Sequence, residues 1–297
     1  MLKRSIFSGF VASILTVSAA MAANVNRHLE HSEHVCAGLV PENDLNIPAN
    51  VFAAGGINKA QFNQILDRIE SIYRPEIESL GDTLTVNRYW DDGTVNAYAN
   101  KSGTNRTINI YGGIARFRSI GVEGFALAVC HEIGHHLGGG PKYSGRESWG
   151  GTEGAADYFA TLKCMRRYLA NEDNANALKN LKVDPVAKTA CQKQFSNPRD
   201  QLICQRASVG GEQLTQLHQF IGGIPVKPKY GTPDTYVLTE ADESYPHPQC
   251  RMDTYFQGML CAQNENTRMS DTDYKQGSCY EPVHQIGARP RCWFVPN

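Results

Sequence analysis

His131-Glu132-Ile133-Gly134-His135 is the stretch of this chain that decides its fold. On an α-helix the two histidines lie one turn apart on one face, so both imidazoles can bind the same metal ion without distorting the helix. Glu132 stands between them, close enough to take a proton from a water molecule beside that ion. The spacing therefore predicts a zinc site with His131 and His135 as ligands and Glu132 as the general base.

The residues on both sides of this stretch predict a buried helix with a defined end. Residues 124–130, GFALAVC, are apolar, as a helix inside a core requires. Gly138-Gly139-Gly140-Pro141 follows, and glycine and proline at this place end a helix. The two histidines therefore belong to a helix inside the core.

A catalytic zinc also needs a third protein ligand and one open position for water. The metzincin arrangement requires a histidine where this chain has Pro141, so it is excluded. In the gluzincin arrangement the third ligand is a glutamate on a second helix a short loop downstream, and Glu153 opens such a helical pattern, EGAADYFA. Asp157 lies one turn later on the same face, where we expect it to accept a hydrogen bond from the outer nitrogen of a ligating histidine.

These residues resemble those of the gluzincin metallopeptidases, and most of all the CAAX prenyl-endopeptidase and HtpX-like family, over roughly residues 58–163. Upstream of the metal helix, residues 95–99 (VNAYA) and 107–114 (TINIYGGI) are similar to that family's Asn-Ala-aromatic-Ala stretch and apolar strand. The resemblance implies an edge strand along the substrate cleft, to which an extended peptide adds by main-chain hydrogen bonds. The residues implied to contact the peptide are Asn96, Ala97, Tyr98 and Ala99.

A second similarity lies far downstream. Residues 244–252, SYPHPQCRM, resemble that family's His-Pro segment followed by an arginine. The resemblance implies that His247 is a second catalytic residue, which donates to the oxygen that becomes negatively charged during acyl transfer. Two alternatives remain open, namely that Tyr245 is that donor or that His247 is only a turn histidine with a local partner.

The first residues of the chain predict export. Lys3-Arg4, the apolar run 6–17 and Ala20-Met21-Ala22 have the charged, hydrophobic and small-residue parts of a secretory signal, with cleavage after Ala22. No later stretch is long and apolar enough to span a bilayer, so we expect no stable membrane insertion. The expected location is a bacterial periplasm or the extracellular space.

Nine cysteines follow the predicted signal, and export favours disulfides between them. The odd number leaves one cysteine unpaired. Cys130 is the predicted free thiol because it precedes His131 in an apolar helix, and the alternative is a bond to Cys36. A structural zinc held by thiolates is disfavoured, since the chain has no Cys-x-x-Cys pair.

The fold class predicted is α+β, with a zincin-like metallopeptidase core that contains a small antiparallel sheet and the two metal helices. An amphipathic helix is expected over residues 58–80, and the sheet over 82–114 with a turn at Asp91-Asp92-Gly93. Further helices are expected from Glu153 to about Leu169, around Leu178 and Leu214, and over 249–261. The predicted parts are a signal peptide (1–22), an N-terminal arm able to cover the cleft (23–57), the catalytic core (58–170), an insertion of helices and loops (171–245) and a C-terminal helix with a Cys-rich tail (246–297).

Together the motif and the resemblance predict an exported endopeptidase with one catalytic Zn²⁺ and a peptide or protein substrate. A formal net charge of −1 and the absence of a Lys/Arg run argue against nucleic acid or an acidic membrane surface as the partner. The alternative is a catalytically inactive exported zinc-binding or envelope-scaffolding protein, which would keep the metal site without turnover.

Overall fold

The computed structural model describes residues 38–51 and 56–296 of the chain. Within them, helices and one small three-stranded sheet give an α+β architecture, as the sequence predicts. The predicted signal peptide (1–22) and Cys36 lie outside the described residues. The described helices include none with the length and hydropathy that a membrane span requires.

The sheet consists of β1 (Thr83–Tyr89), β2 (Ala97–Ser102) and β3 (Asn105–Tyr111), with β3 in the centre. β2 and β3 form an antiparallel hairpin, and its turn contains Gly103 at a φ of 58°, which glycine adopts without strain. β1, however, is parallel to β3. The sheet is therefore mixed, and the prediction of an antiparallel sheet is wrong for β1.

The connection between β1 and β2 explains this difference. The turn predicted at Asp91-Asp92-Gly93 does not join neighbouring strands, because residues 90–96 cross to the far side of β3 before β2 begins. Arg116 holds this connection in place by donating hydrogen bonds to the carbonyl oxygens of Trp90 (2.8 Å) and Asp92 (3.0 Å). No local pattern in the sequence distinguishes such a crossover from a hairpin.

α1 (Lys59–Glu78) confirms the helix predicted for residues 58–80. The Asn58 side chain accepts a hydrogen bond from Gln61 N (2.9 Å), and the Gln61 side chain accepts one from Asn58 N (3.0 Å), which satisfies two main-chain donors at the helix start. The predicted apolar face packs into the core through the buried residues Phe62, Ile65, Leu66 and Ile69, with Ile72 half-buried at its margin.

The other helices follow the predictions closely. The one predicted from Glu153 forms as three consecutive segments, α4 (Glu153–Phe159), the π-helical η2 (Ala160–Met165) and α5 (Arg166–Leu169). Those expected near Leu178 and Leu214 and over 249–261 are α6 (Asn174–Leu178), α8 (Pro198–Ile221) and α9 (Pro248–Leu260). The elements not predicted are α2 (Gly112–Ala115), α7 (Pro185–Gln194), the short 3₁₀ helix η1 (Gly145–Glu147) and the π-helical turn.

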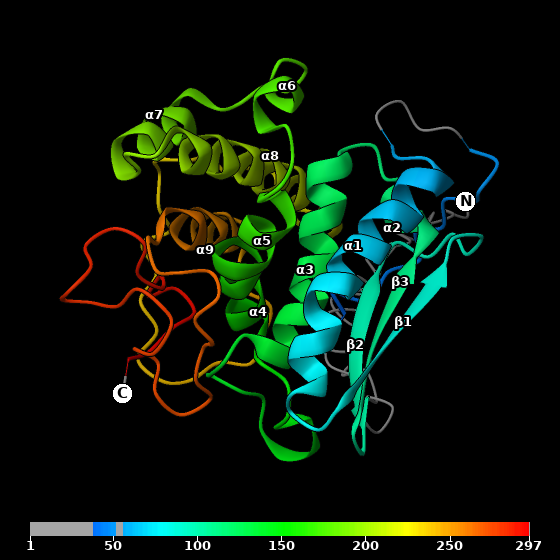
Figure 1. Cartoon of the computed structure of the whole chain (residues 1–297), viewed down its shortest axis with the longest axis horizontal. Coiled ribbons are helices and arrows are strands. Elements are labelled where there is room, and N and C mark those ends of the chain that lie inside the picture. The colour runs from blue at the N-terminus through cyan, green and yellow to red at the C-terminus, as the bar shows by residue number, and fades with distance from the viewer. Residues whose placement is uncertain (1–37, 52–55, 297) are drawn as a thin grey trace, which may run out of the picture. The chain divides into compact units, whose positions relative to one another are not determined.

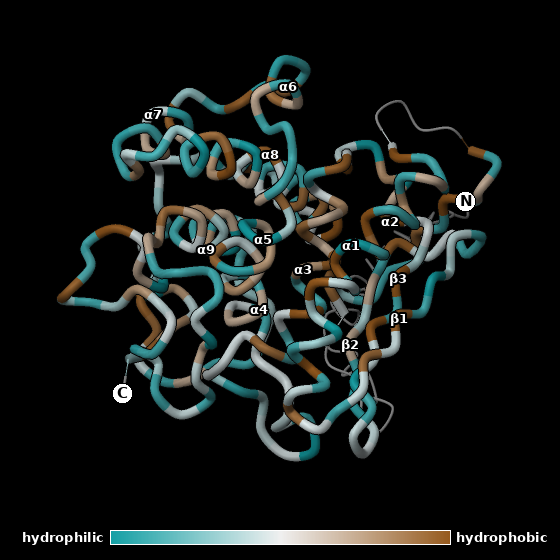
Figure 2. The backbone as a smooth tube through the Cα atoms, in the orientation of Figure 1, coloured by the Kyte–Doolittle hydropathy of each residue, from teal (hydrophilic) through white to brown (hydrophobic). Residues whose placement is uncertain are grey.

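α3 (Val122–Leu137) carries the metal motif through the centre of the core, and it ends at Gly138, as predicted. It contacts α1 and the sheet on one side and α4 and α8 on the other (Figure 1). Every residue of α3 after Val122 is buried, and many residues along α3 are hydrophobic (Figure 2). One hydrophobic core extends from Leu39 to Phe294, so the predicted arm, insertion and tail all contribute to it.

Four disulfides join eight cysteines of the described residues, which confirms the prediction of disulfide bonding. The pairs are Cys130–Cys164, Cys191–Cys204, Cys250–Cys292 and Cys261–Cys279. The prediction for Cys130 is wrong in both of its forms, because this residue is bonded to Cys164 on η2 and neither stays free nor pairs with Cys36. α3 and η2 pack side by side, so two cysteines that are distant in the sequence come within bonding distance.

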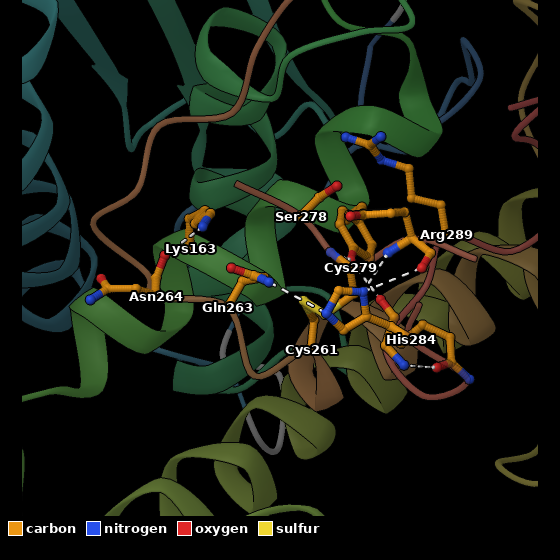
Figure 3. The surroundings of a disulfide bond; sticks show 12 residues. Lys163, Cys261, Gln263, Asn264, Ser278, Cys279, His284 and Arg289 are labelled. Atoms are coloured by element: carbon orange, nitrogen blue, oxygen red, sulfur yellow. Dashed lines mark hydrogen bonds between the residues drawn. A yellow bond between two sulfur atoms is a disulfide. The ribbon is translucent and has the colours of Figure 1, made fainter. Parts of the chain in front are cut away.

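Hydrogen bonds join the Cys-rich tail to the second metal helix. Figure 3 shows the surroundings of the Cys261–Cys279 bond, where Lys163 of η2 donates to Asn264 O (2.6 Å) in the tail. Burial lowers the pKa of Lys163 to about 8, since its ammonium is largely removed from water. The tail thus anchors the helix that begins with Glu153.

Candidate metal centre

The two metal helices come close together because Gly134 has no side chain. A Cβ at Gly134 would lie 2.7 Å from Ala156 O and 2.8 Å from Ala156 Cα, both on α4. This close approach brings Glu153, the first residue of α4, to the face of α3 that carries the two histidines. The glycine inside the motif therefore sets the distance between the candidate ligands.

His131, His135 and Glu153 form a buried group that can hold a metal ion. The distance from His131 Nε2 to Glu153 Oε2 is 3.3 Å, and His135 Nε2 lies 3.5 Å from Glu153 Oε1. All candidate ligand atoms lie within 4.8 Å of one another. The two Nε2 atoms and Glu153 Oε2 are buried without a hydrogen-bond partner among the described residues. Buried polar atoms are rarely left unpaired, so three that converge fit the coordination of a cation.

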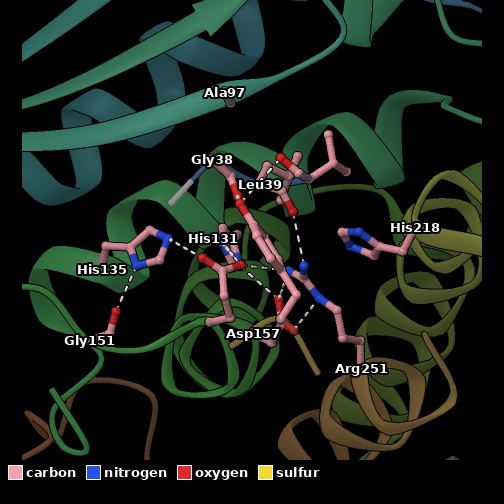
Figure 4. Close-up of polar contacts among 12 residues, drawn as sticks. Gly38, Leu39, Ala97, His131, His135, Gly151, Asp157, His218 and Arg251 are labelled. Atoms are coloured by element: carbon pink, nitrogen blue, oxygen red, sulfur yellow. Dashed lines mark hydrogen bonds and ion pairs between the residues drawn. The ribbon is translucent and has the colours of Figure 1, made fainter. Parts of the chain in front are cut away.

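The Nδ1 atoms of both histidines have hydrogen-bond partners, and their Nε2 atoms face the candidate metal site. His131 Nδ1 lies 2.7 Å from Asp157 Oδ1, and His135 Nδ1 lies 2.8 Å from Gly151 O (Figure 4). Since a carboxylate and a carbonyl oxygen only accept hydrogen bonds, each Nδ1 carries the proton and each Nε2 presents its lone pair. Both imidazoles are thus fixed in the tautomer that binds a metal through Nε2.

Asp157 is the centre of a wider buried network. Arg251 of α9 donates to it twice, from Nε to Oδ2 (2.7 Å) and from Nη2 to Oδ1 (2.8 Å), and Tyr255 OH donates to Oδ1 (2.7 Å). Burial alone would raise the pKa of Asp157, but the positive charge of Arg251 and the hydrogen bond from His131 outweigh it and hold that pKa well below its usual range. Asp157 therefore stays ionised and accepts the hydrogen bond from His131 Nδ1 as a carboxylate.

Glu132 is fully buried, and neither carboxylate oxygen has a hydrogen-bond partner among the described residues. Burial raises the pKa of Glu132 to about 8, with His131 acting against the shift and Glu153 adding to it. A divalent cation bound to the neighbouring ligands would lower this pKa again, because an opposite charge nearby favours the ionised form.

Glu153 has further partners that hold its carboxylate in place. Tyr143 OH donates to Oε1 (3.1 Å), and Arg251 Nη2 lies 3.3 Å from Oε2. Tyr143 comes from the glycine-rich loop between α3 and α4, and its ring also stacks on His135. This contact could not be predicted, since a loop tyrosine has no pattern that ties it to a ligand.

The residues predicted to bind a peptide lie at the edge of the sheet nearest the metal group. β2 is an edge strand, and Ala97 lies above the metal group in Figure 4. Part of this edge is already paired, because Leu39 N donates to Ala97 O (3.0 Å). Asn96 is buried and holds both main-chain polar groups of Val40. The chain's own residues thus occupy positions that were predicted for a substrate.

Tyr245 and His247 have different surroundings. The side chain of His247 is 51% exposed and caps α9, where its Nδ1 accepts a hydrogen bond from Gln249 N (3.3 Å). Both residues line a cavity of about 570 Å³. Tyr245 OH reaches inward and donates to Gly38 O (2.6 Å), and burial raises its pKa well above the ordinary value, with Glu153 adding to the shift. The catalytic role of His247 stays a prediction, while the structure gives it a capping role.

Comparison with protein-family models, curated proteins and solved structures finds no match for this chain.

The main site residues that the sequence did not predict are those that hold Asp157 from far downstream in the chain. The Asp157 network includes Arg251 and Tyr255, which lie more than ninety residues downstream, and His218 Nε2 lies 3.2 Å from Tyr255 OH. The one available signal was the arginine in SYPHPQCRM, which the resemblance singled out without giving it a role. Its place on α9 shows that it binds Asp157 and lies beside Glu153.

Proposed function

We propose that this protein is an exported zinc-dependent endopeptidase. The observation that carries the proposal is the convergence of two imidazole nitrogens and one carboxylate, all buried, beside the unpartnered carboxylate of Glu132. Two histidines and one glutamate suit catalytic zinc, which takes water as its fourth ligand, whereas calcium and magnesium prefer sites made of oxygen ligands alone. The proposed cofactor is one Zn²⁺ held by His131, His135 and Glu153.

The reaction we propose is hydrolysis of a peptide bond. Zinc, when bound, lowers the pKa of a water molecule and polarises the carbonyl that is attacked. Glu132 takes the proton of the attacking water and later passes it to the leaving amine. Asp157 and Gly151 O keep the two imidazoles oriented through their Nδ1 atoms.

Tyr245 supports the developing charge on the carbonyl oxygen in this proposal. Its hydroxyl already donates to a peptide carbonyl, that of Gly38, and its raised pKa keeps it protonated at neutral pH. A donor of this kind stabilises an oxyanion more than the neutral carbonyl that precedes it. His247 remains the alternative donor, since it is half exposed and lines the same cavity as Tyr245.

The disulfides support the location that we propose. Four bonds in one chain form and persist in an oxidising compartment, which agrees with export to a bacterial periplasm or to the outside of the cell. The proposed substrate is a peptide or protein bound in extended form along β2. Main-chain pairing makes little demand on side chains, so an unfolded protein is a suitable first substrate.

The experiment compares the chain from Ala23 onward with its Glu132→Gln variant. Metal content is measured by mass spectrometry, and cleavage is measured on unfolded casein. We expect one zinc in both proteins and cleavage only by the parent, because the amide of glutamine cannot accept the proton. The absence of zinc would overturn the proposal. If zinc binds but neither the parent nor its Gly38→Ala and Leu39→Ala variants cleave casein, the inactive zinc-binding or scaffolding protein would be favoured.

A further inference from the structure

The residues at the start of the described chain run along the edge of the sheet. Leu39 N donates to Ala97 O (3.0 Å) and Ile47 N donates to Gly93 O (2.8 Å), so residues 38–47 lie antiparallel to the segment that leads into β2. This is the direction in which an extended peptide adds to the edge of an antiparallel pair of strands. One main-chain hydrogen bond, from Leu39 N to Ala97 O, thus joins this segment to β2, and the other joins it to the connection that precedes β2.

Asn96 recognises this segment through its backbone. Its Oδ1 accepts a hydrogen bond from Val40 N (3.2 Å), and its Nδ2 donates to Val40 O (3.0 Å). A side-chain amide that binds both polar groups of one residue reads the main chain and is indifferent to the side chain. The same amide can hold any extended peptide placed there.

The two carbonyls before Val40 are held by residues of the metal centre. Tyr245 OH donates to Gly38 O (2.6 Å), and Arg251 Nη1 donates to Leu39 O (2.9 Å). Arg251 also binds Asp157, and its Nη2 lies 3.3 Å from Glu153 Oε2. Figure 4 shows Gly38 and Leu39 between Ala97 of β2 and the metal group.

We propose that Gly38–Val40 occupies the main-chain binding positions of the substrate, so that the chain is latent while this segment is in place. The binding positions are Ala97 O, the Asn96 amide, Tyr245 OH and Arg251 Nη1, and their ligand is an extended peptide that runs antiparallel to β2. This inference rests on the proposed function and adds its regulation. Activation then requires the segment to leave, by displacement or by cleavage.

The segment is held by side chains as well as by hydrogen bonds. Leu39 and Val40 are fully buried in the hydrophobic core, which keeps the segment in place most of the time. A peptide can bind only to the molecules from which the segment has left. If it is absent in about 1% of them, the apparent affinity for the peptide falls about 100-fold.

Gly38 provides a way to release the segment. A Cβ at this position would lie 2.7 Å from the Asn96 side chain and 2.8 Å from Tyr98 Cε1, so alanine does not fit while the segment is bound. Gly38→Ala therefore disfavours the occupied state by contact alone. Leu39→Ala weakens it by a second route, the loss of buried apolar surface. Leu66→Ala is the matched control, because Leu66 is equally buried but lies on α1.

The first experiment measures binding without catalysis. A fluorescently labelled peptide with the sequence of residues 38–47, GLVPENDLNI, is titrated into zinc-loaded proteins that all carry Glu132→Gln. We expect Gly38→Ala and Leu39→Ala to bind it at least about ten-fold more tightly than the parent, and Leu66→Ala to bind like the parent. Thermal unfolding of each variant shows which of them are folded.

Equal affinities in the folded variants would overturn the inference, whatever their activity. Loss of folding in both segment variants would overturn it too, because the segment would then be a fixed part of the core. A second measurement, casein cleavage with Glu132 intact, should show a rise of at least about ten-fold in Gly38→Ala. If the parent cleaves casein and the segment variants gain neither peptide affinity nor cleavage rate, the proposed function holds and the latency inference is wrong. If the segment variants bind the peptide more tightly but no protein cleaves casein, the peptide-binding site is supported and the proposed peptidase activity is wrong.

Discussion

Arg251 and Asp157 form a fully buried ion pair with two parallel hydrogen bonds, of 2.7 and 2.8 Å, between α9 and α4. Asp157 uses the same carboxylate to hold His131, so the pair connects the C-terminal part of the chain to a metal ligand. The pKa of Arg251 is raised well above its ordinary value because the attraction of Asp157 outweighs the effect of burial. Both groups therefore stay charged, and each needs the other.

Replacement of Arg251 by methionine should destabilise the fold strongly. Met keeps most of the apolar stem but leaves Asp157 as a buried charge without its main partner, at a cost of about 3–5 kcal/mol in the free energy of unfolding. Urea unfolding monitored by circular dichroism measures this. Arg199→Met is the control, since Arg199 lies on the surface and its replacement should change the stability by less than about 0.5 kcal/mol. Equal losses of unfolding free energy in the two variants would show that the buried pair stabilises the fold no more than a surface arginine does.

Asp157→Asn should weaken metal binding as well as the fold, because it also leaves the buried Arg251 without its charged partner. The amide keeps the shape of the side chain but loses the negative charge that fixes the proton on His131 Nδ1. We expect about a ten- to hundred-fold loss in zinc affinity, measured by competition with a chelator of known affinity. An unchanged affinity would reduce Asp157 to a structural partner of Arg251.

The metal helices could be predicted from the sequence because their geometry is local. His131 and His135 reach one ion through the repeat of a single helix, and Gly138 marks the helix end within a few residues. The partners of these residues could not be predicted, because Arg251 reaches Asp157 only once α9 has packed against α4. A helical pattern states which face is polar and gives no information about which distant residue meets that face.

The predictions of an antiparallel sheet and of a free Cys130 are wrong for the same reason. A strand pattern does not say which neighbour it pairs with, and β1 lies beside β3 because the connection over residues 90–96 crosses the sheet. Cys130 is buried in an apolar helix, as predicted, yet the packing of α3 against η2 places it against Cys164. The position of Gly38 beside Ala97 and Tyr245 likewise depends on contacts between residues far apart in the sequence.

His135→Ala should abolish both zinc binding and hydrolysis, because it removes one of three protein ligands. The neighbouring His136→Ala is the matched control. His136 is buried as well, but its Nε2 lies 3.2 Å from Thr107 O and its ring stacks on Trp149, away from the ligands. Metal analysis should therefore find one zinc in His136→Ala and none in His135→Ala. An active, metal-free His135→Ala would rule out the assignment of the ligands.

The disulfide between Cys130 and Cys164 should contribute more to stability than the one between Cys191 and Cys204. The first closes a loop with a sequence separation of 34 and the second a loop with a separation of 13. In the chain-entropy model a longer loop restricts the unfolded chain more, and the loss expected for Cys130→Ala/Cys164→Ala is about 3–4 kcal/mol. Urea unfolding of both double variants tests the order. A smaller loss for the longer loop would mean that the α3–η2 contact holds without its bond.

Acid should destabilise the metal-free fold through His136. Burial lowers the pKa of His136 to about 3, although its contact with Thr107 O acts in the opposite direction. The unfolded chain therefore binds a proton near pH 6.5 that the folded chain refuses, and stability falls between pH 6.5 and 3 with a slope of up to about 1.4 kcal/mol per unit. Urea unfolding in EDTA, which removes the effect of metal loss, should show a shallower slope for His136→Gln. Parallel slopes for parent and variant would show that His136 does not control this acid sensitivity.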